Sequence, residues 1–155
     1  VWVKNLKTGN LNAKRQPMGG HEDIVAFCKK SPTYNPQKRK RTTEVKAGNK
    51  RNSTTSVYGS QRELYVDNQS DMINPDTVIS GINCVHSSEG RLHPTQKPVA
   101  LMEYLINTYT NEGDLVLDNC AGSGTTGVAA RNLKRNFILI EKEPEYCDVI
   151  RKRLK

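Results

Sequence analysis

The stretch that decides the fold is residues 115–141, which read LVLDNCAGSGTTGVAARNLKRNFILIE. It opens with a short apolar run that ends at Asp118, as expected of a buried strand in a parallel sheet. A glycine-rich turn follows, and a helix is predicted from near Thr125 to about Leu133. A second apolar run then ends at Glu141. Strand, glycine turn, helix and strand in this order predict a doubly wound, Rossmann-like α/β sheet.

Further elements are predicted on both sides of this stretch. Pro98 suits the first turn of a helix, where the missing N–H of proline costs nothing. The residues at helical spacing after it are Leu101, Met102, Leu105, Ile106 and Tyr109. Pro144 opens a last helix with one apolar face, formed by Tyr146, Val149, Ile150 and Leu154. Towards the N-terminus, β-prone composition predicts strands at Val1–Val3, Asp23–Lys29 and Thr77–His86.

The glycine-rich turn has the pattern of a nucleotide site. Residues 122–127 read GSGTTG and match G-x-G-x-x-G in the strand-to-helix context that the pattern requires. Glu141 follows 19 residues after Gly122, near the position where an acid accepts hydrogen bonds from a ribose. Together they favour a binding site for an adenosine-type ligand; the alternative is a plain tight turn without a ligand. Asp118 would oppose a pyrophosphate but suits an ammonium and a sulfonium, which favours S-adenosylmethionine over NAD. Asp118 could instead cap the end of its strand.

Positive charge is concentrated in one segment. The net charge is +8, and residues 29–62 hold ten Lys or Arg against one acid, whereas the rest of the chain holds 14 basic and 15 acidic residues. This polar segment cannot bury enough apolar surface to fold alone, so a long, partly flexible loop is expected. The segment is either a solvated loop or an arm that contacts nucleic-acid phosphates. In an arm of this kind, Tyr34 and Tyr58 could stack on bases. The candidate DNA contacts are Lys38, Arg39, Lys40, Arg41, Lys50 and Arg51.

Cysteine spacing and hydropathy exclude several classes of protein. Cys28, Cys84, Cys120 and Cys147 form no CxxC pair, so no metal site is expected. Each lies in an apolar stretch, which predicts reduced cysteines in the core of a cytoplasmic protein. The longest apolar run has five residues, too few for a transmembrane helix, and the N-terminus has no signal-peptide core.

Three motifs carry a family resemblance. They are HPTQKP at 93–98, LDNCAGSGTT at 117–126, and FILIE at 137–141 followed by Pro144-Glu145-Tyr146. They resemble the C-terminal part of a circularly permuted (beta-group) S-adenosylmethionine-dependent DNA amino-methyltransferase. The resemblance is dense over 93–154 and looser over 1–37.

The resemblance implies a cofactor site. Glu141 would bind the ribose hydroxyls, and Asp118 would hold the methionine end and sugar together with the glycines. Thr95 and Lys97 would face the methionine carboxylate, although Thr95 could be a helix cap and Lys97 a solvated surface lysine. His93 is expected to be structural; His21 and Glu22 would either shape the target-base pocket or hold a loop. The full set is Thr95, Lys97, Asp118, Asn119, Cys120, Ala121, Gly122, Ser123, Gly124, Thr125 and Glu141.

The resemblance also implies a function and three regions. Region 1–30 would supply strands of the catalytic-domain sheet, 31–76 the basic target-recognition region that contacts double-stranded DNA, and 77–155 the cofactor-binding part. The implied reaction is methylation of adenine N6 in DNA, with cytosine N4, a degenerate or split DNA-binding module, and an NAD-type Rossmann protein as alternatives. A bacterial or phage source is expected.

The catalytic motif of that family is missing. This Asp/Asn/Ser-Pro-Pro-aromatic loop holds the flipped base, and the chain has no Pro-Pro dipeptide. No catalytic residue is therefore assigned. The chain begins with Val, and the loop is expected upstream of Val1, in a missing N-terminal part; a homodimer is the alternative partner.

Overall fold

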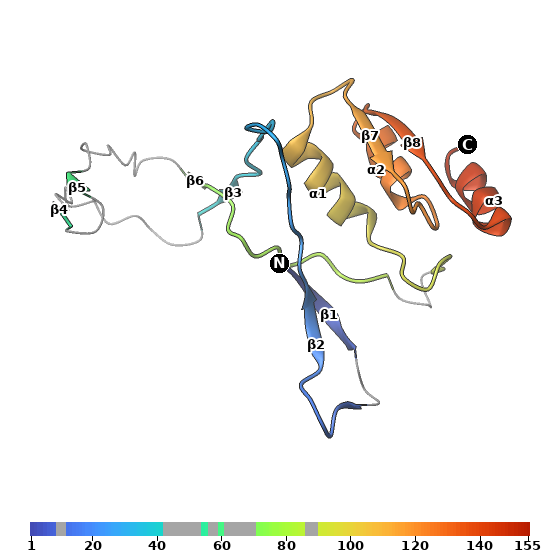
Figure 1. The fold of residues 1–155 in the computed structure, drawn as a ribbon, viewed down its shortest axis with the longest axis horizontal. Coiled ribbons are helices and arrows are strands. Elements are labelled where there is room, and N and C mark those ends of the chain that lie inside the picture. Colours follow the sequence, from blue (N-terminus) through green and yellow to red (C-terminus); the bar gives the residue numbers. More distant parts are fainter. Residues whose placement is uncertain (9–11, 42–53, 56–58, 61–70, 86–89) are drawn as a thin grey trace. The chain divides into compact units, whose positions relative to one another are not determined.

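The computed structural model describes residues 1–8, 12–41, 54–55, 59–60, 71–85 and 90–155 (Figure 1). These residues form two compact units. The first unit comprises Val1–Gln37 and Asp76–Lys155, and the second, here called the basic unit, comprises Lys38–Pro75.

The C-terminal part of the first unit is the predicted βαβα arrangement. Strand β7 (Leu115–Asp118) is followed by helix α2 (Thr125–Asn132), strand β8 (Asn136–Leu139) and helix α3 (Pro144–Arg153). The two strands are parallel and in continuous register, from Leu115 opposite Asn136 to Asp118 opposite Leu139. Each of these elements agrees with the sequence-based prediction to within about a residue. Because the strands are parallel, their carboxyl ends meet at one edge of the sheet, where the glycine turn and Glu141 lie.

Helix α1 (Val99–Tyr109) begins directly after Pro98, as predicted. It packs against α2, and the small residues of α2 allow a close approach. Leu101 and Ile106 are buried on α1, and Ala129 and Ala130 are completely buried on α2. Tyr109, expected on the buried face, is instead 40% exposed.

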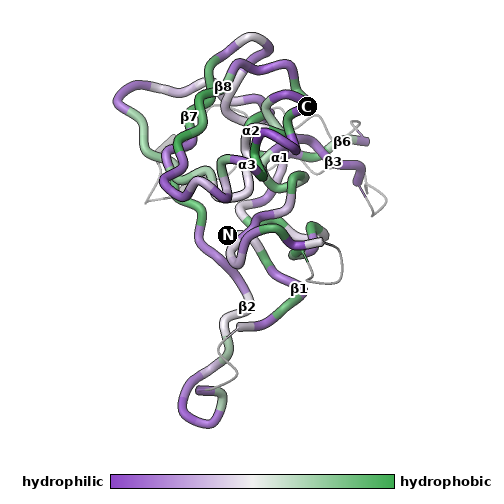
Figure 2. Tube along the Cα trace, turned by 90° about the vertical axis from the view of Figure 1, so that its right-hand side faces the viewer, coloured by the Kyte–Doolittle hydropathy of each residue, from purple (hydrophilic) through white to green (hydrophobic). Residues whose placement is uncertain are grey.

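The two faces of the β7–β8 sheet differ in burial. Successive side chains of a strand point to opposite faces. Val116 and Phe137 pack against the core formed with α1 and α2, whereas the alternate residues Leu115, Leu117, Ile138 and Ile140 are 49–62% exposed. Figure 2 shows the hydrophobic residues along both strands. Among the described residues, therefore, only one face of this parallel sheet is covered.

The N-terminal segment forms a separate antiparallel pair. Strand β1 (Trp2–Thr8) pairs with β2 (Gly19–Glu22). The Trp2 side chain is 2% exposed, and its indole N–H donates to the Ile82 carbonyl at 2.9 Å. The predicted strand at Val1–Val3 is thus confirmed and is longer than expected. In 77–85 only Ile79 forms a bridge, to Trp2, so the predicted strand there is wrong, and His86 lies outside the described residues.

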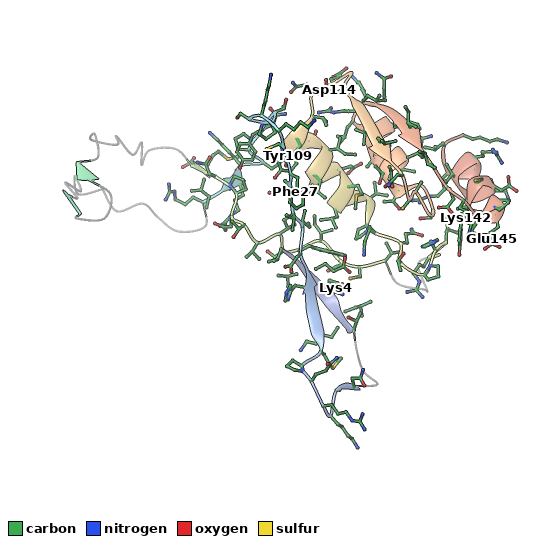
Figure 3. All side chains as sticks on the ribbon, viewed as in Figure 1. Lys4, Phe27, Tyr109, Asp114, Lys142 and Glu145 are labelled. Carbon is green, nitrogen blue, oxygen red and sulfur yellow. The ribbon has the colours of Figure 1, made fainter. Side chains whose placement is uncertain are left out.

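The predicted buried strand at Asp23–Lys29 is also wrong. Residues 23–29 form no strand, and their side chains are exposed. Val25 is 67% and Phe27 91% exposed, and Figure 3 labels Phe27 on this extended chain. The composition does favour a strand, but a strand needs a backbone partner, and no described segment pairs with this one. Region 1–30 thus supplies β1 and β2, which pair with each other and not with β7 or β8.

The basic unit contains short antiparallel pairs. Strand β3 (Arg39–Lys40) pairs with β6 (Met72–Ile73), and β4 (Thr54–Thr55) pairs with β5 (Gly59–Ser60). It begins later than the expected boundary at residue 31, because Asn35 belongs to the first unit. The Asn35 amide donates to the carbonyls of Asn107 and Thr110 at the C-terminal end of α1.

The described helices include none that is both long and apolar enough to cross a membrane.

Candidate functional site

Asp118 organises the turn that follows β7. Its Oδ1 accepts the N–H of Cys120 at 3.0 Å, and its Oδ2 accepts the hydroxyl of Thr126 at 2.6 Å. One carboxylate thus joins the start of the glycine turn (residues 119–124) to the first turn of α2. This is the capping role that the sequence left open. An ionised carboxylate has about four acceptor positions, so two remain for a ligand.

Two glycines give the turn its shape. Gly122 and Gly124 have φ of +53° and +76°, values that strain any residue with a side chain. Gly124 donates its N–H to the Ala121 carbonyl at 2.7 Å, which closes the turn. A Cβ on Gly124 would lie 2.9 Å from Ile150, and one on Gly122 would lie 3.4 Å from the His93 ring. The space above both glycines is therefore occupied by other parts of the first unit.

Glu141 contacts the glycine turn directly. Its Oε2 accepts the Gly122 N–H at 2.7 Å, while Oε1 accepts the N–H groups of Lys142 at 2.8 Å and Glu143 at 3.0 Å. The N–H groups of Glu143 and Gly122 lower the pKa of Glu141, with smaller contributions from Lys142 and the charge of His93. The carboxylate is thus held ionised, and Oε2 keeps an acceptor position for a hydroxyl donor.

The segment 93–98 reaches the same turn through His93. The Nδ1 atom of His93 lies 3.2 Å from the Thr95 backbone nitrogen and 3.1 Å from the Thr95 hydroxyl. The ring meets Tyr146 of α3 edge-on, with 4.4 Å between centroids. The N-cap of α1 is Pro98 and has no side-chain cap, so Thr95 is not a cap of that helix. His93 thus connects Thr95 with α3, and its structural role stays a prediction.

Lys97 forms an ion pair with β2. Its Nζ lies 2.7 Å from Oε2 of Glu22, and Lys4, with a side chain only 8% exposed, lies 3.4 Å from Oε1 of the same carboxylate. The bond from Lys97 is the largest of several contacts with the two lysines that lower the pKa of Glu22. Lys97 is therefore not an unpaired surface lysine. Glu22 holds a loop, whereas the side chain of His21 is 60% exposed.

The remaining predicted residues differ in burial. Ala121, Ser123 and Thr125 are 3–7% exposed and form the packed base of the turn, whereas Asn119 and Cys120 are exposed. Cys28 is also exposed, and Cys84 and Cys147 are half-buried, so the expectation of core cysteines is wrong. Apolar neighbours in sequence do not guarantee a buried position where a sheet face is uncovered. The described residues contain no cluster of three metal-ligating side chains.

The candidate DNA contacts belong to the basic unit. Lys38, Arg39 and Lys40 are exposed, and Arg41 is half-buried, with its N–H bonded to the Asp71 carbonyl at 2.7 Å. Lys50 and Arg51 lie outside the described residues.

Arg153 is a residue that the sequence analysis missed. Its guanidinium reaches the glycine turn from the last turn of α3 and donates to the Ser123 carbonyl at 2.7 Å. Its 30-residue separation from Ser123 has no motif attached to it, and a basic residue at the end of a helix ordinarily suggests only a favourable dipole interaction.

Comparisons with known proteins agree with this geometry. Residues 1–152 match the family model N6_N4_Mtase, described as DNA methylase. The chain is 56% identical over 62 residues to the Type II methyltransferase M2.DpnII of Streptococcus pneumoniae, which is 40% of this chain and 23% of that protein. It is 32% identical over 158 residues to M.BglII of Bacillus subtilis, which is 96% of this chain and 39% of that protein.

A solved structure gives the same result. The crystal structure of the M1.HpyAVI–SAM complex is similar with a TM-score of 0.55 and 30% identity, over 99% of this chain and 59% of that one. The matched parts thus span less than two thirds of the length of each relative named here. The likeness confirms the Rossmann-like α/β class. With 152 of its 155 residues inside the family model, the chain belongs to the N6/N4 DNA methylase family.

Proposed function

We propose that this chain is the cofactor-binding and target-recognition part of an S-adenosylmethionine-dependent DNA methyltransferase that modifies the N6 amine of adenine. The observation that carries the proposal is the bond between the Gly122 N–H and Glu141. It joins the glycine turn to the acid at the edge of the sheet where the strands end, which is where α/β folds bind nucleotides.

The donor set fits this cofactor. Glu141 is ionised and has an acceptor position for a ribose hydroxyl, and Asp118 offers two acceptor positions beside the turn. Two carboxylates at this edge of the sheet suit a cationic ligand better than a pyrophosphate, which supports S-adenosylmethionine over NAD. When bound, S-adenosylmethionine supplies an electrophilic methyl group on its sulfonium.

The residues of this chain would bind and orient the cofactor. Lys97, held by Glu22, and Thr95, held by His93, would face the methionine carboxylate. The basic unit would contact the phosphates of double-stranded DNA through Lys38, Arg39, Lys40 and Arg41, in the position of an inserted target-recognition region. The permuted motif order, with segment 93–98 before the glycine turn, belongs to the same proposal.

Two measurements test the proposal. In calorimetry on the full-length protein, S-adenosylmethionine should bind with one site per chain, and NAD should give no binding isotherm. Binding of NAD alone would refute the cofactor assignment. DNA incubated with protein and methyl-labelled cofactor should then contain N6-methyladenine. N4-methylcytosine would keep the cofactor assignment and replace the target base, whereas cofactor binding without any methylated base would favour a degenerate module.

A further inference from the structure

Arg153 contacts the glycine turn in a way that its position in α3 does not explain by itself. One nitrogen, Nη1, lies 2.7 Å from the Ser123 carbonyl, 3.2 Å from the Ser123 hydroxyl and 3.3 Å from the Thr125 hydroxyl. Ser123 and Thr125 are 3% and 6% exposed. The guanidinium is therefore inserted against the most buried polar groups of the turn.

This placement has an electrostatic cost. Partial burial lowers the pKa of Arg153, although a guanidinium stays charged in proteins. Its three partners also lie at the N-terminal end of α2, where the helix dipole favours anions over cations. Hydrogen bonds from a charged donor are about twice as strong as neutral ones, and they offset this cost. Such an arrangement is expected where a defined turn geometry has a function.

The contact with the Ser123 carbonyl fixes one peptide plane. In a trans peptide the C=O and the following N–H point in opposite directions. Holding the Ser123 carbonyl towards Arg153 therefore turns the Gly124 N–H away from it, towards the Ala121 carbonyl that it bonds at 2.7 Å. The neighbouring Gly122 N–H is held by Glu141. The turn is thus fixed by α3 through Arg153 and by the end of β8 through Glu141.

We infer that Arg153 is a positioning residue, which does not touch the cofactor but holds the glycine turn in the shape that binds it. This inference rests on the proposed function. In the parent protein, the entropic cost of ordering the turn is met before the cofactor binds. Without Arg153 the cofactor would have to order the turn itself, so the loss of affinity should exceed what the effect of the mutation on folding explains.

The chain offers a matched control on the same helix. Lys152 is the preceding residue and lies about 100° away around the helix. It is exposed. Replacing either residue by methionine removes one positive charge and keeps a similar length, so that K152M and R153M differ mainly in contact with the turn.

The test measures cofactor affinity, thermal stability and amide exchange in the full-length protein. We expect R153M to raise the Kd for S-adenosylmethionine at least about tenfold, the loss of a charge-assisted hydrogen bond. R153K should recover part of this loss, and K152M should stay within about twofold of the parent. R153M should also speed hydrogen exchange at the amides of Gly122 and Gly124. Should R153M not fold, R153Q takes its place.

The outcomes separate the inference from the function on which it rests. Parent-like Kd and exchange in R153M would overturn the role of Arg153, as would an equal loss in K152M. A lower melting temperature with unchanged Kd would show a merely structural contact and overturn it too. If the parent itself binds no S-adenosylmethionine, the proposed function fails, and the exchange rates alone decide whether Arg153 orders the turn.

Discussion

In the glycine turn, backbone groups make most of the contacts, whereas the main feature of the basic unit is the charge of its side chains. Around the turn, the N–H groups of Cys120, Gly122 and Gly124 all donate hydrogen bonds. Their acceptors are Asp118, Glu141 and the Ala121 carbonyl, respectively. The basic unit has eight Lys or Arg and four acidic residues, and the strand pairs among its described residues are two residues long. A site made of backbone donors needs a fixed conformation, whereas a phosphate-binding surface needs mainly charge. The two regions should therefore respond differently to mutation and to salt.

The largest effect should come from removing charge in the basic unit. Changing Lys38, Arg39, Lys40 and Arg41 together to Gln should flatten the slope of log K against log salt by up to about four units, because each neutralised phosphate contributes about −0.9. Between 50 and 200 mM salt this difference corresponds to about a hundredfold in DNA affinity. The measurement is duplex binding by parent and variant across that salt range.

Cofactor affinity is the control for this variant. It should not change, because the proposed cofactor residues all belong to the first unit. Salt plots that are parallel and of equal height would show a solvated loop and remove the contrast between the two regions.

The next effect should come from Glu141. Glu141→Ala removes the acceptor of the Gly122 N–H and the proposed ribose contact, and it should raise the Kd for S-adenosylmethionine at least about tenfold. Glu145→Ala is the matched control. Glu145 also carries a carboxylate near the start of α3 (Figure 3) but is exposed. Calorimetry on both variants gives the comparison, and an unchanged Kd in Glu141→Ala would remove the central claim about the site.

The same contrast explains how much of the structure the sequence could predict. Asp118, the glycines and Glu141 lie in one stretch whose strand and turn signals agree, so the elements and their ligand-binding edge could be identified. The strand expected at Asp23–Lys29 fails because pairing depends on a distant partner, which composition does not reveal. Arg153 and the Lys97–Glu22 pair were missed for the same reason. In both contacts a long side chain reaches a residue far away in the chain, and the sequence does not show which residue that is.

A smaller effect is expected at Glu22, which sharpens the description of the first unit. Its pKa is lowered from 4.5 by Lys97 and Lys4, so the folded protein binds fewer protons than the unfolded chain in this range. Its contribution to stability is therefore present above pH 4.5 and is lost as the pH falls below that value. Because the Glu22 side chain is 37% exposed, screening limits this contribution to under about 1 kcal/mol.

Urea unfolding of Glu22→Gln and of the parent at two pH values tests this expectation. The variant should be less stable at pH 7, and the difference should shrink as the pH falls below 4.5. Glu112→Gln is the control, because the Glu112–Lys134 pair is 3.4 Å apart with side chains 65% and 75% exposed. A Glu22 difference that is constant with pH would show that the effect is not electrostatic.

The smallest effects should come from the cysteines, including the one inside the glycine turn. Cys120 contributes its backbone N–H to Asp118, and its side chain is exposed, so that Cys120→Ala keeps the contact that shapes the turn. Cofactor affinity should stay within about twofold, since exposed substitutions rarely exceed about 0.5 kcal/mol. Single Ala variants at Cys28, Cys84 and Cys147 should likewise alter stability more than cofactor binding. Titration of each variant with S-adenosylmethionine and its thermal unfolding check these two expectations. Metal analysis of the purified parent checks the separate expectation that the cysteines bind no zinc. A large loss of affinity in Cys120→Ala would mean that the turn also depends on a side chain, and stoichiometric zinc would give the cysteines a role that their spacing does not predict.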